Sequence, residues 1–526
     1  SWTFRKAEKF FDVVTYTGDD TSNQTIAHNL GSVPGFILLK RTSTTGIWGA
    51  AASDNSGNYK AGWRLDSTSA SALTVAKSNV ATDSVVNVGY WSGNLNGSMN
   101  TSGVTYVAYL FASDAGGFGD DGDENIIKCG SFATDASGAG LVGPDLGFEP
   151  QWVLLKNATS TASGGWWLFD AMRGFTASGG GTSYLLANSS GTEGTFGGET
   201  LNITSNGFTM PSNAFASGQT FIYIAIRRPM KTPESGTEVF DIDLSTTNLQ
   251  DGTELPSTSF ATDMMLSSWR DGGYSTYNIS RLTGGKHLFT HATGAEPSSS
   301  VFDFGYEQDV ISCTGNFDSG SSPRVNYAFK RAPGFMDVVA YTGTGAVRAV
   351  DHNLTVTPEM IILKSRSAAE VWRVYHSALS LNDDMQLQST GAAAANGNFP
   401  TLPTDGVFTV AAGNSTNGTA KTYIAYLFAT LAGVSKVGSI AHSGTTNVAC
   451  GFAGGARFVL AKRTDAAGSW YVWDSTRGIV AGNDPYLFIN TIAAEVTNTD
   501  FIDPLTGGFT FSDNFTDGTY LFLAIA

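Results

Sequence analysis

Short apolar runs recur along the chain at intervals of about 100 residues, which is the size of a domain. Each run is rich in aromatic and β-branched residues and is apolar at successive positions, a pattern typical of a strand buried on both faces. Between the runs, clusters of Gly, Ser, Thr and Asn interrupt a weaker apolar–polar alternation, which predicts outer strands and turns. The five runs, which we expect to be central strands, are residues 106–111, 221–226, 325–329, 423–428 and 520–525.

A second pattern repeats with the same period. A turn marked by Pro or Gly leads into an apolar run, then usually a lysine, and then a polar loop followed by a tryptophan. The lysines are Lys40, Lys156, Lys364 and Lys462, and Ser268 stands at this position in a divergent third copy. Recurrence at this spacing indicates an array of domains rather than a solenoid of short repeats.

The copies fall into three types. Residues 2–14 return as residues 327–339, so the first and fourth copies share their opening, and they also share a His-Asn-Leu turn. The second and fifth copies share an Asp-x-x-Arg-Gly motif that begins at Asp170 and Asp474. The order along the chain is therefore first, second, third, first and second type.

These patterns predict an all-β fold, a tandem array of about five β-sandwich domains, jelly-roll or lectin-like, of about 100 residues each. The expected units are residues 8–117, 118–230, 231–333, 334–433 and 434–526, of which the third is divergent. Residues 1–7 match the closing strand of a third-type unit, so we expect them to belong to a preceding or a partner unit. On this interpretation the sequence lies within a longer array or borrows its missing pieces from a neighbouring chain.

Charge and composition narrow the expected partners. The formal net charge is −16, and only 14% of the residues are charged. Such a chain does not neutralise phosphates, and it has no run of 18 apolar residues, so we expect no nucleic-acid partner and no membrane insertion. The three cysteines, Cys129, Cys313 and Cys450, fall in different units, which argues against a disulfide framework and favours folding in a cytosol.

The densest group of charges is acidic and lies at the junction of the first two units. Asp120, Asp121, Asp123 and Glu124 supply the hard oxygen ligands that Ca²⁺ prefers. Their spacing does not match the helix–loop–helix calcium motif, and no other junction repeats it. The alternative is a solvated acidic turn. We expect no other cofactor.

The tryptophans that follow the lysines suggest a second candidate site. Most should be core anchors, but where two stand close together on a strand, alternation would direct one ring outward. An outward ring beside Asn and Ser loops could stack on a sugar. The candidate carbohydrate-binding residues are Trp166, Trp167, Trp470 and Trp473.

Two further motifs have simpler interpretations. Arg173 and Arg477 each follow an aspartate by three positions, which favours a salt bridge that fixes a loop. His28 and His352 precede Asn-Leu in equivalent places, which favours a shared structural turn. The sequence contains no nucleophile elbow, zinc-protease motif, phosphate loop or Cys-x-x-Cys, so we do not expect an enzyme.

The residues that carry a family resemblance are Trp2–Ala7, Phe11–Gly18, His28–Gly35, Tyr106–Ala112 and Asn125–Gly130. They resemble a repeated domain of unknown function found in large virion and tail proteins of tailed bacteriophages, especially marine ones. The resemblance spans essentially the whole chain, and the third unit departs most from it. The family offers no catalytic residues to carry over to this sequence.

The resemblance implies a virion structural protein, a tail fibre or surface appendage, made in the cytoplasm of the bacterial host. We expect it to mediate attachment to a host surface glycan or outer-membrane protein. Its expected partners are other copies of itself, as a homotrimer by default, and other virion proteins. One alternative is a capsid, tail or decoration protein without a receptor, and a second is a polysaccharide depolymerase.

Overall fold

The structure is a computed structural model. It describes residues 1–53, 59–68, 74–75, 81–88, 91–92, 99–134, 141–159, 165–177, 182–196, 201–211, 218–229, 231–245, 252–255, 257–298, 300, 302–304, 310–314 and 322–526.

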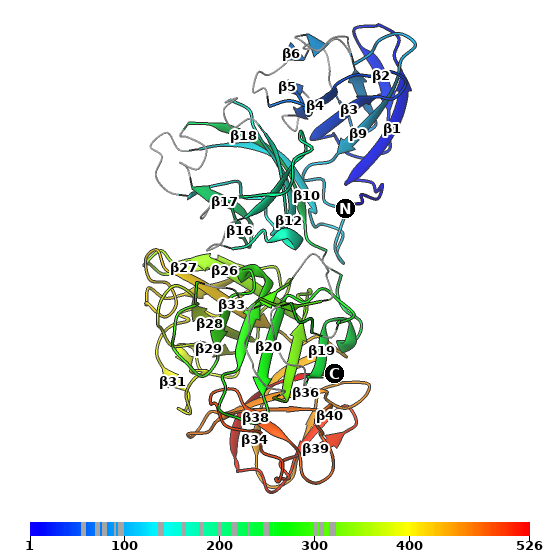
Figure 1. The fold of residues 1–526 in the computed structure, drawn as a ribbon. Helices are drawn as coiled ribbons and strands as arrows, with labels where there is room; N and C mark the ends of the chain where they lie inside the picture. The colour runs from blue at the N-terminus through cyan, green and yellow to red at the C-terminus, as the bar shows by residue number, and fades with distance from the viewer. Residues whose placement is uncertain are drawn as a thin grey trace. The chain divides into compact units, whose positions relative to one another are not determined.

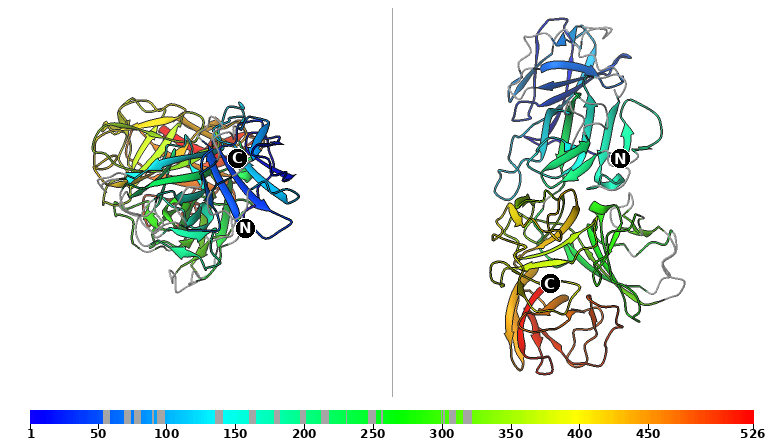
Figure 2. Two further views of the ribbon diagram at one scale, coloured as in Figure 1. Left: turned by 90° about the horizontal axis from the view of Figure 1, so that it is seen from above. Right: turned by 90° about the vertical axis from the view of Figure 1, so that its left-hand side faces the viewer.

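The expected all-β architecture is confirmed, and Figures 1 and 2 show strands throughout. Helical structure in the described ranges is limited to three 3₁₀ turns: η1 (Ala171–Arg173), η2 (Gly236–Glu238) and η3 (Arg281–Thr283). No helix in this part of the chain has the length and hydrophobicity to cross a membrane.

The chain divides into two compact units. Unit 1 contains Ser1–Phe175 and Gly180–Pro229, and unit 2 contains Thr176–Gly179 and Met230–Ala526. The strands form five groups, here called bodies 1 to 5, with bodies 1 and 2 in unit 1 and bodies 3, 4 and 5 in unit 2. Among the described strands, no sheet draws on two bodies.

Unit 1 contains eighteen of the strands. Body 1 contains β1 (Phe11–Thr17), β2 (Gln24–Ala27), β3 (Phe36–Arg41), β4 (Trp48–Ser53), β5 (Tyr59–Arg64), β6 (Thr74–Val75), β7 (Val85–Val88), β8 (Trp91–Ser92) and β9 (Thr105–Phe111). Body 2 contains β10 (Ile127–Ala133), β11 (Leu141–Val142), β12 (Pro150–Asn157), β13 (Trp166–Asp170), β14 (Ser183–Leu186), β15 (Gly194–Thr195), β16 (Asn202–Thr204), β17 (Gly207–Pro211) and β18 (Thr220–Arg227).

Unit 2 contains the remaining strands. Body 3 contains β19 (Phe240–Ser245), β20 (Met264–Trp269), β21 (Tyr277–Ser280), β22 (His287–Phe289), β23 (Phe302–Asp303), β24 (Ser312–Cys313) and β25 (Arg324–Phe329). Body 4 contains β26 (Met336–Thr342), β27 (Arg348–Asp351), β28 (Met360–Ser365), β29 (Arg373–His376), β30 (Asp383–Asp384), β31 (Ala394–Ala395), β32 (Val407–Val410) and β33 (Thr422–Phe428). Body 5 contains β34 (Ser435–His442), β35 (Thr446–Ala449), β36 (Phe458–Arg463), β37 (Trp470–Asp474), β38 (Tyr486–Phe488), β39 (Ile502–Leu505), β40 (Gly508–Phe511) and β41 (Gly518–Ile525).

Every main sheet has the same strand order. The opening strand pairs with the closing strand, the closing strand pairs with the strand after the Pro or Gly turn, and the tryptophan-bearing hairpin partner follows; body 1, for example, has the order β1-β9-β3-β4-β5. The apolar closing runs are therefore central strands, as their sequence predicts. The other main sheets are β10-β18-β12-β13-β14-β15, β19-β25-β20-β21-β22, β26-β33-β28-β29 and β34-β41-β36-β37-β38.

A smaller sheet covers one face of the main sheet, and the core lies between the two. In body 5, Val459 and Phe522 of the main sheet share a hydrophobic cluster with Phe509 and Ile502 of the sheet β35-β40-β39. Body 4 has the same arrangement, with Ile361 of its main sheet packed in one cluster with residues of β27 and β32. These bodies are sandwiches, each with its own core.

The second face of the main sheets is also buried in unit 2. An apolar cavity lies where bodies 3, 4 and 5 meet, opposite their sandwich cores. Its lining includes Met264, Leu266 and Phe329 of body 3, Ile362, Tyr426 and Phe428 of body 4, and Phe458, Leu460 and Leu523 of body 5. In unit 2 the closing strands are apolar at successive positions because one face of each strand packs in its own sandwich and the other packs against neighbouring bodies.

Candidate functional site

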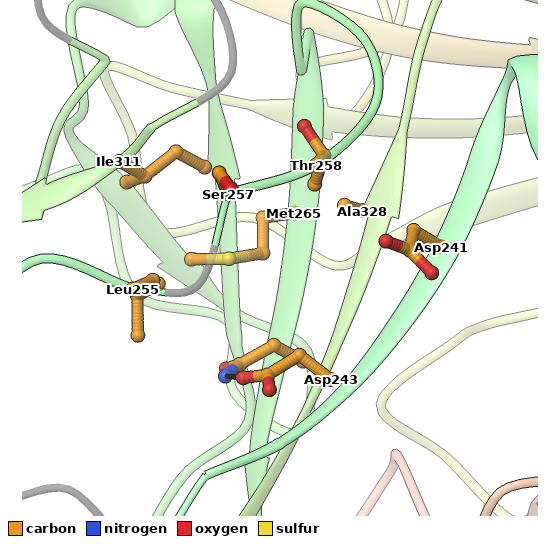
Figure 3. A pocket seen from close by; sticks show the side chains of 9 residues that line it. Asp241, Asp243, Leu255, Ser257, Thr258, Met265, Ile311 and Ala328 are labelled. Carbon is orange, nitrogen blue, oxygen red and sulfur yellow. Dashed lines mark hydrogen bonds between the residues drawn. The ribbon is translucent and has the colours of Figure 1, made fainter.

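A pocket opens inside body 3, on the sandwich face of its main sheet. Figure 3 shows Asp241 and Asp243 of β19 on one side of Met265, with Leu255 and Ile311 on the other. The two aspartates face the same way because they are two positions apart on one strand. The remaining lining residues are Ser257, Thr258, Asn326 and Ala328.

Two polar residues of this pocket, Asp243 and Asn326, occupy positions that are apolar in body 4, whereas Asp241 corresponds to an aspartate there, Asp337. Asp243 pairs across the sheet with Asn326, whereas the matching pair of body 4 is Val339 with Ala425. In body 4 this pair lies in the hydrophobic cluster between the two sheets. Body 3 has therefore replaced two apolar side chains of a sandwich interior by a carboxylate and an amide. Asn326 is buried and Asp243 is half-buried, and polar groups in such a place cost stability unless their hydrogen bonds are made, which makes this pair a candidate for function.

The electrostatics of the pocket favour ligands that donate hydrogen bonds. Burial raises the pKa of Asp243, Asn326 opposes this by donating to Oδ2 at 2.9 Å, and the nearby carboxylate of Asp241 raises the pKa further. Asp241 itself lies 3.6 Å from Arg457 of body 5. Asn326 Oδ1 is buried, and no described group hydrogen-bonds to it. Carboxylates, an amide oxygen and the hydroxyls of Ser257 and Thr258 together suit hydroxyl or ammonium groups.

The candidate tryptophans do not form a surface platform. Trp166, Trp167, Trp470 and Trp473 are 1%, 6%, 0% and 0% exposed, so the expectation of an outward ring is wrong. Alternation does direct neighbouring rings to opposite faces, but both faces are covered. One face packs in the sandwich core, where Trp473 lies, and the other lies against another body, as for Trp470.

The candidate calcium ligands do not converge. Asp120, Asp121 and Asp123 are exposed, and Glu124 forms an ion pair with Arg227 at 2.8 Å. Across the described ranges, no three His, Cys, Asp or Glu side chains gather in a way that could hold a metal ion. The described side chains therefore do not form a calcium cluster in this arrangement, and calcium binding stays a prediction. The acidic residues form a turn in which Gly117 N donates to Gly122 O at 3.0 Å.

The two simpler interpretations are confirmed. Asp170 pairs with Arg173 and Asp474 with Arg477, and each aspartate also accepts backbone N–H groups at the start of the next turn. His28 Nδ1 accepts the N–H of Leu30 at 3.2 Å, and His352 repeats this bond with Leu354. These motifs are structural.

The repeated lysines and tryptophans lie at junctions between bodies. Lys364 of body 4 is fully buried, and its ammonium donates to Thr293 O of body 3 at 3.1 Å. Trp372 donates its indole N–H to Phe289 O of the same body at 3.0 Å. Burial lowers the pKa of Lys364 to about 8, with Glu370 acting in the opposite direction. Three hydrogen bonds to carbonyl oxygens compensate the desolvation of this ammonium.

The same pairing joins body 5 to body 4 and body 2 to body 1. The donor–acceptor pairs are Lys462 with Thr390 O (3.1 Å), Trp470 with Gln386 O (3.1 Å), Lys156 with Thr68 O (3.2 Å) and Trp166 with Arg64 O (3.0 Å). Burial lowers the pKa of both lysines to about 8. Sequence reasoning found this pattern but assigned the tryptophans to the core of each unit, because a junction and a core look alike in one sequence.

Body 3 lacks the Lys–Trp pair, and it contacts body 5 by other groups. Ser268 stands in the place of the lysine. Gly273 N donates to Ile492 O of body 5 at 2.8 Å, and Arg270 binds both carboxylate oxygens of Glu495. Body 4 thus docks on body 3, body 3 on body 5, and body 5 on body 4. We call this closed cycle the three-body ring of unit 2.

A buried ionic network stabilises the contact of bodies 3 and 5. Tyr327 of body 3 donates its hydroxyl proton to Asp474 Oδ2 at 2.8 Å. Arg477 pairs with Asp474, donates to Tyr327 Oη at 2.9 Å and reaches Glu495 at 3.0 Å. Glu495 also receives Arg270, so the network links β25 and the end of β20 in body 3 to two loops of body 5. Every charge in it has a partner, which a buried ionic network requires.

The sequence matches a known protein family. Residues 5–229 and 293–526 match the family model described as "Domain of unknown function (DUF7483)". The chain belongs to this family. No curated protein sequence matches the chain.

The DUF7483 match covers the first-type and second-type bodies of both units and leaves out residues 230–292. This gap holds β19 to β22 of body 3, with both aspartates of the pocket. The pocket therefore lies largely in the part of the chain that departs from the family pattern, as does the replacement of the junction lysine by Ser268.

Proposed function

We propose that the protein is a structural component of a bacteriophage virion, a tail fibre or other surface appendage that contacts the host surface. The family resemblance suggests the virion. The observation that carries the appendage role is the three-body ring, whose junctions are hydrogen-bonded and two of which repeat the same Lys–Trp pair. Bodies locked in this way form a stiff unit, as an exposed appendage requires.

The pocket of body 3 is the proposed contact with the receptor. Its acceptor groups suit the hydroxyls of a surface glycan. This assignment replaces the tryptophan platform expected from the sequence. Assembly with other virion proteins and with further copies of the chain, a homotrimer by default, remains part of the proposal.

Localisation in the particle tests the virion role. Antibodies raised against the chain should label purified virions in immunogold electron microscopy at a tail or surface appendage. Labelling of the capsid shell favours a decoration protein, and the absence of the chain from purified virions in mass spectrometry contradicts the proposal.

Binding to host cells tests the attachment role. The purified chain should bind susceptible cells, and the D243V/N326A double variant, which restores the apolar pair of body 4, should bind at least tenfold more weakly. If the parent chain and the double variant bind cells equally, the pocket of body 3 is not the receptor site. A fall in the viscosity of host polysaccharide on incubation with the chain favours a depolymerase.

A further inference from the structure

Residues 1–7 pack in unit 1 as the end of body 3 packs in unit 2. Trp2 corresponds to Tyr327 and Phe4 to Phe329 in the repeat. Phe4 packs edge-on against Phe111 with ring centroids 6.1 Å apart, and Phe329 packs against Phe428 at the same distance. Phe111 and Phe428 are the last residues of the closing strands of bodies 1 and 4.

The contact with the second-type body repeats as well. Phe4 lies 5.6 Å from Trp152 of body 2, and Phe329 lies 6.1 Å from Phe458 of body 5, both edge-on. Trp152 and Phe458 pair with equivalent isoleucines of the closing strands. The segment of residues 1–7 therefore occupies, in unit 1, the place that the end of a third-type body occupies in the ring.

The face of body 1 that would meet such a body is open. In body 4, Ile362, Lys364, Trp372 and Tyr426 are buried against body 3, and Tyr426 donates its hydroxyl proton to Asn278 there. The equivalent side chains of body 1 are all only half-buried: Leu38, Lys40, Trp48 and Tyr109. Lys40 donates to Gly46 O of its own loop instead. The strands of bodies 1 and 4 are alike, but no third-type body covers this face of body 1.

Body 2 is open on the complementary side. Leu185 is 39% exposed, whereas the equivalent Leu487 of body 5 is 3% exposed. Arg173 Nη1 is buried and has no hydrogen-bond partner among the described residues, whereas Arg477 Nη1 binds Glu495, which Arg270 of body 3 also binds. The face of body 1 that carries Lys40 and Trp48 and the face of body 2 that carries Leu185 and Arg173 thus lack the same neighbour.

We propose that unit 1 binds a third β-sandwich body of the same type as body 3, whose closing strand ends in residues 1–7, and that this body completes a second three-body ring. Body 3 of unit 2 shows which groups the bound body must present. It presents carbonyl acceptors to Lys40 and Trp48, as Thr293 and Phe289 do for body 4, and an arginine toward body 2, as Arg270 does for body 5. This inference does not depend on a virion role.

Lysine acetylation followed by mass spectrometry tests the proposal. In the 526-residue chain, Lys40 should react while Lys364 and Lys462 stay protected. Residues 231–326 are then added ahead of Trp2, which restores the register of the repeat. Reaction at Lys40 should fall at least tenfold. In the same extended chain, L38E should restore the reaction at Lys40 and leave Lys364 protected.

A chimera keeps the test valid if the added body does not fold. Residues 9–229 replace residues 334–526 behind the natural body 3, so that one of two Lys40 copies faces a folded third-type body. Total reaction at Lys40 should fall by about half. Unchanged reaction at Lys40 in the chimera overturns the proposal. Protection of Lys40 in the 526-residue chain itself, together with a dimer in light scattering, also overturns it, because a second copy would then be the occupant.

Discussion

Trp2 and Tyr327 donate hydrogen bonds to equivalent aspartates of the two second-type bodies. Trp2 Nε1 lies 3.3 Å from Asp170 Oδ2, and Tyr327 Oη lies 2.8 Å from Asp474 Oδ2. The first bond is in unit 1 and the second is inside the ring of unit 2. The contribution of this hydrogen bond to stability can therefore be measured twice, in unit 1 with Trp2 partly exposed and in the closed ring of unit 2 with Tyr327 buried.

Replacing Tyr327 by Phe should destabilise unit 2 by roughly 1.5–3 kcal/mol, the usual contribution of a hydrogen bond to a charged group. The substitution leaves Asp474 and Arg477 buried with one partner fewer. The control is W2F, which should cost less than about 1 kcal/mol because Trp2 is 37% exposed. Urea unfolding followed by hydrogen exchange of peptides from each unit measures both. Equal losses in the two variants would contradict the closed network.

Replacing Glu495 by Gln should cost about 3 kcal/mol or more, because Arg477 is then buried without its full counter-charge. The side chain of Arg477 is fully buried, and that of Glu495 is 6% exposed. The matched control is E193Q at the equivalent position of body 2, where the glutamate is exposed and a near-zero effect is expected. The readout is the unfolding midpoint of unit 2, and a neutral E495Q would disprove the role of the network.

Replacing Lys364 by Met should destabilise the junction of bodies 4 and 3 by roughly 1–3 kcal/mol, since buried carbonyls lose their donor. K40M is the control and should have little effect in the 526-residue chain, because Lys40 is half-buried. Hydrogen exchange in β28 and around Thr293 reports the change. If K364M protects these segments as well as the parent does, the lysine is not a junction element.

The buried carboxyl of Asp484 should make unit 2 less stable as pH rises from about 4 to 6. Burial raises its pKa to about 6, the hydrogen bonds from Val480 and Ile502 oppose this, and Asp500 adds to the rise. Because the folded state binds the proton more tightly than the unfolded chain, the stabilisation is complete below pH about 4 and is lost above the folded pKa. D484N should flatten this window in urea melts taken at each pH. A parent protein whose stability rises across the same window would rule this out.

Restoring the apolar pair in body 3 should stabilise it. D243V/N326A replaces the half-buried Asp243 and the buried Asn326 by the Val–Ala pair of body 4, and a gain of about 1 kcal/mol is expected if the polar pair is kept for binding. D243N alone should give no such gain, since the amide remains polar. Thermal unfolding of the chain measures both variants, and a loss of stability in the double variant would indicate a structural role for the pair.

Much of the fold followed from the sequence because repetition samples the same pattern several times. The closing runs, the Asp–Arg turn and the His-Asn-Leu turn are local features, and each appears with its predicted role. The location of the tryptophans could not be derived in this way. Trp470 meets a neighbouring body, and a strand pattern does not reveal whether its second face is covered by solvent or by another domain.

The pocket of body 3 was missed for a different reason. Asp243 and Asn326 are far apart in the sequence, and they become conspicuous only when β19 and β25 are set in register beside β26 and β33. The signal was present in the repeat itself, as an aspartate where the first-type bodies carry a valine. The acidic residues at the junction of bodies 1 and 2 do not converge because like charges on an exposed turn repel one another, and Glu124 pairs with Arg227 instead.

The three-body ring of unit 2 is built by one polypeptide, so the sequences of its three bodies are encoded separately. An assembly of identical subunits repeats every mutation at each symmetric position, and a costly polar substitution would weaken all of its interfaces together. Here body 3 carries a serine in place of the lysine and two polar residues at positions that are apolar in body 4, while bodies 4 and 5 both carry the Lys–Trp pair. Because the three bodies are separate parts of one polypeptide, one body can acquire new chemistry while the junctions of the other two keep the ring closed.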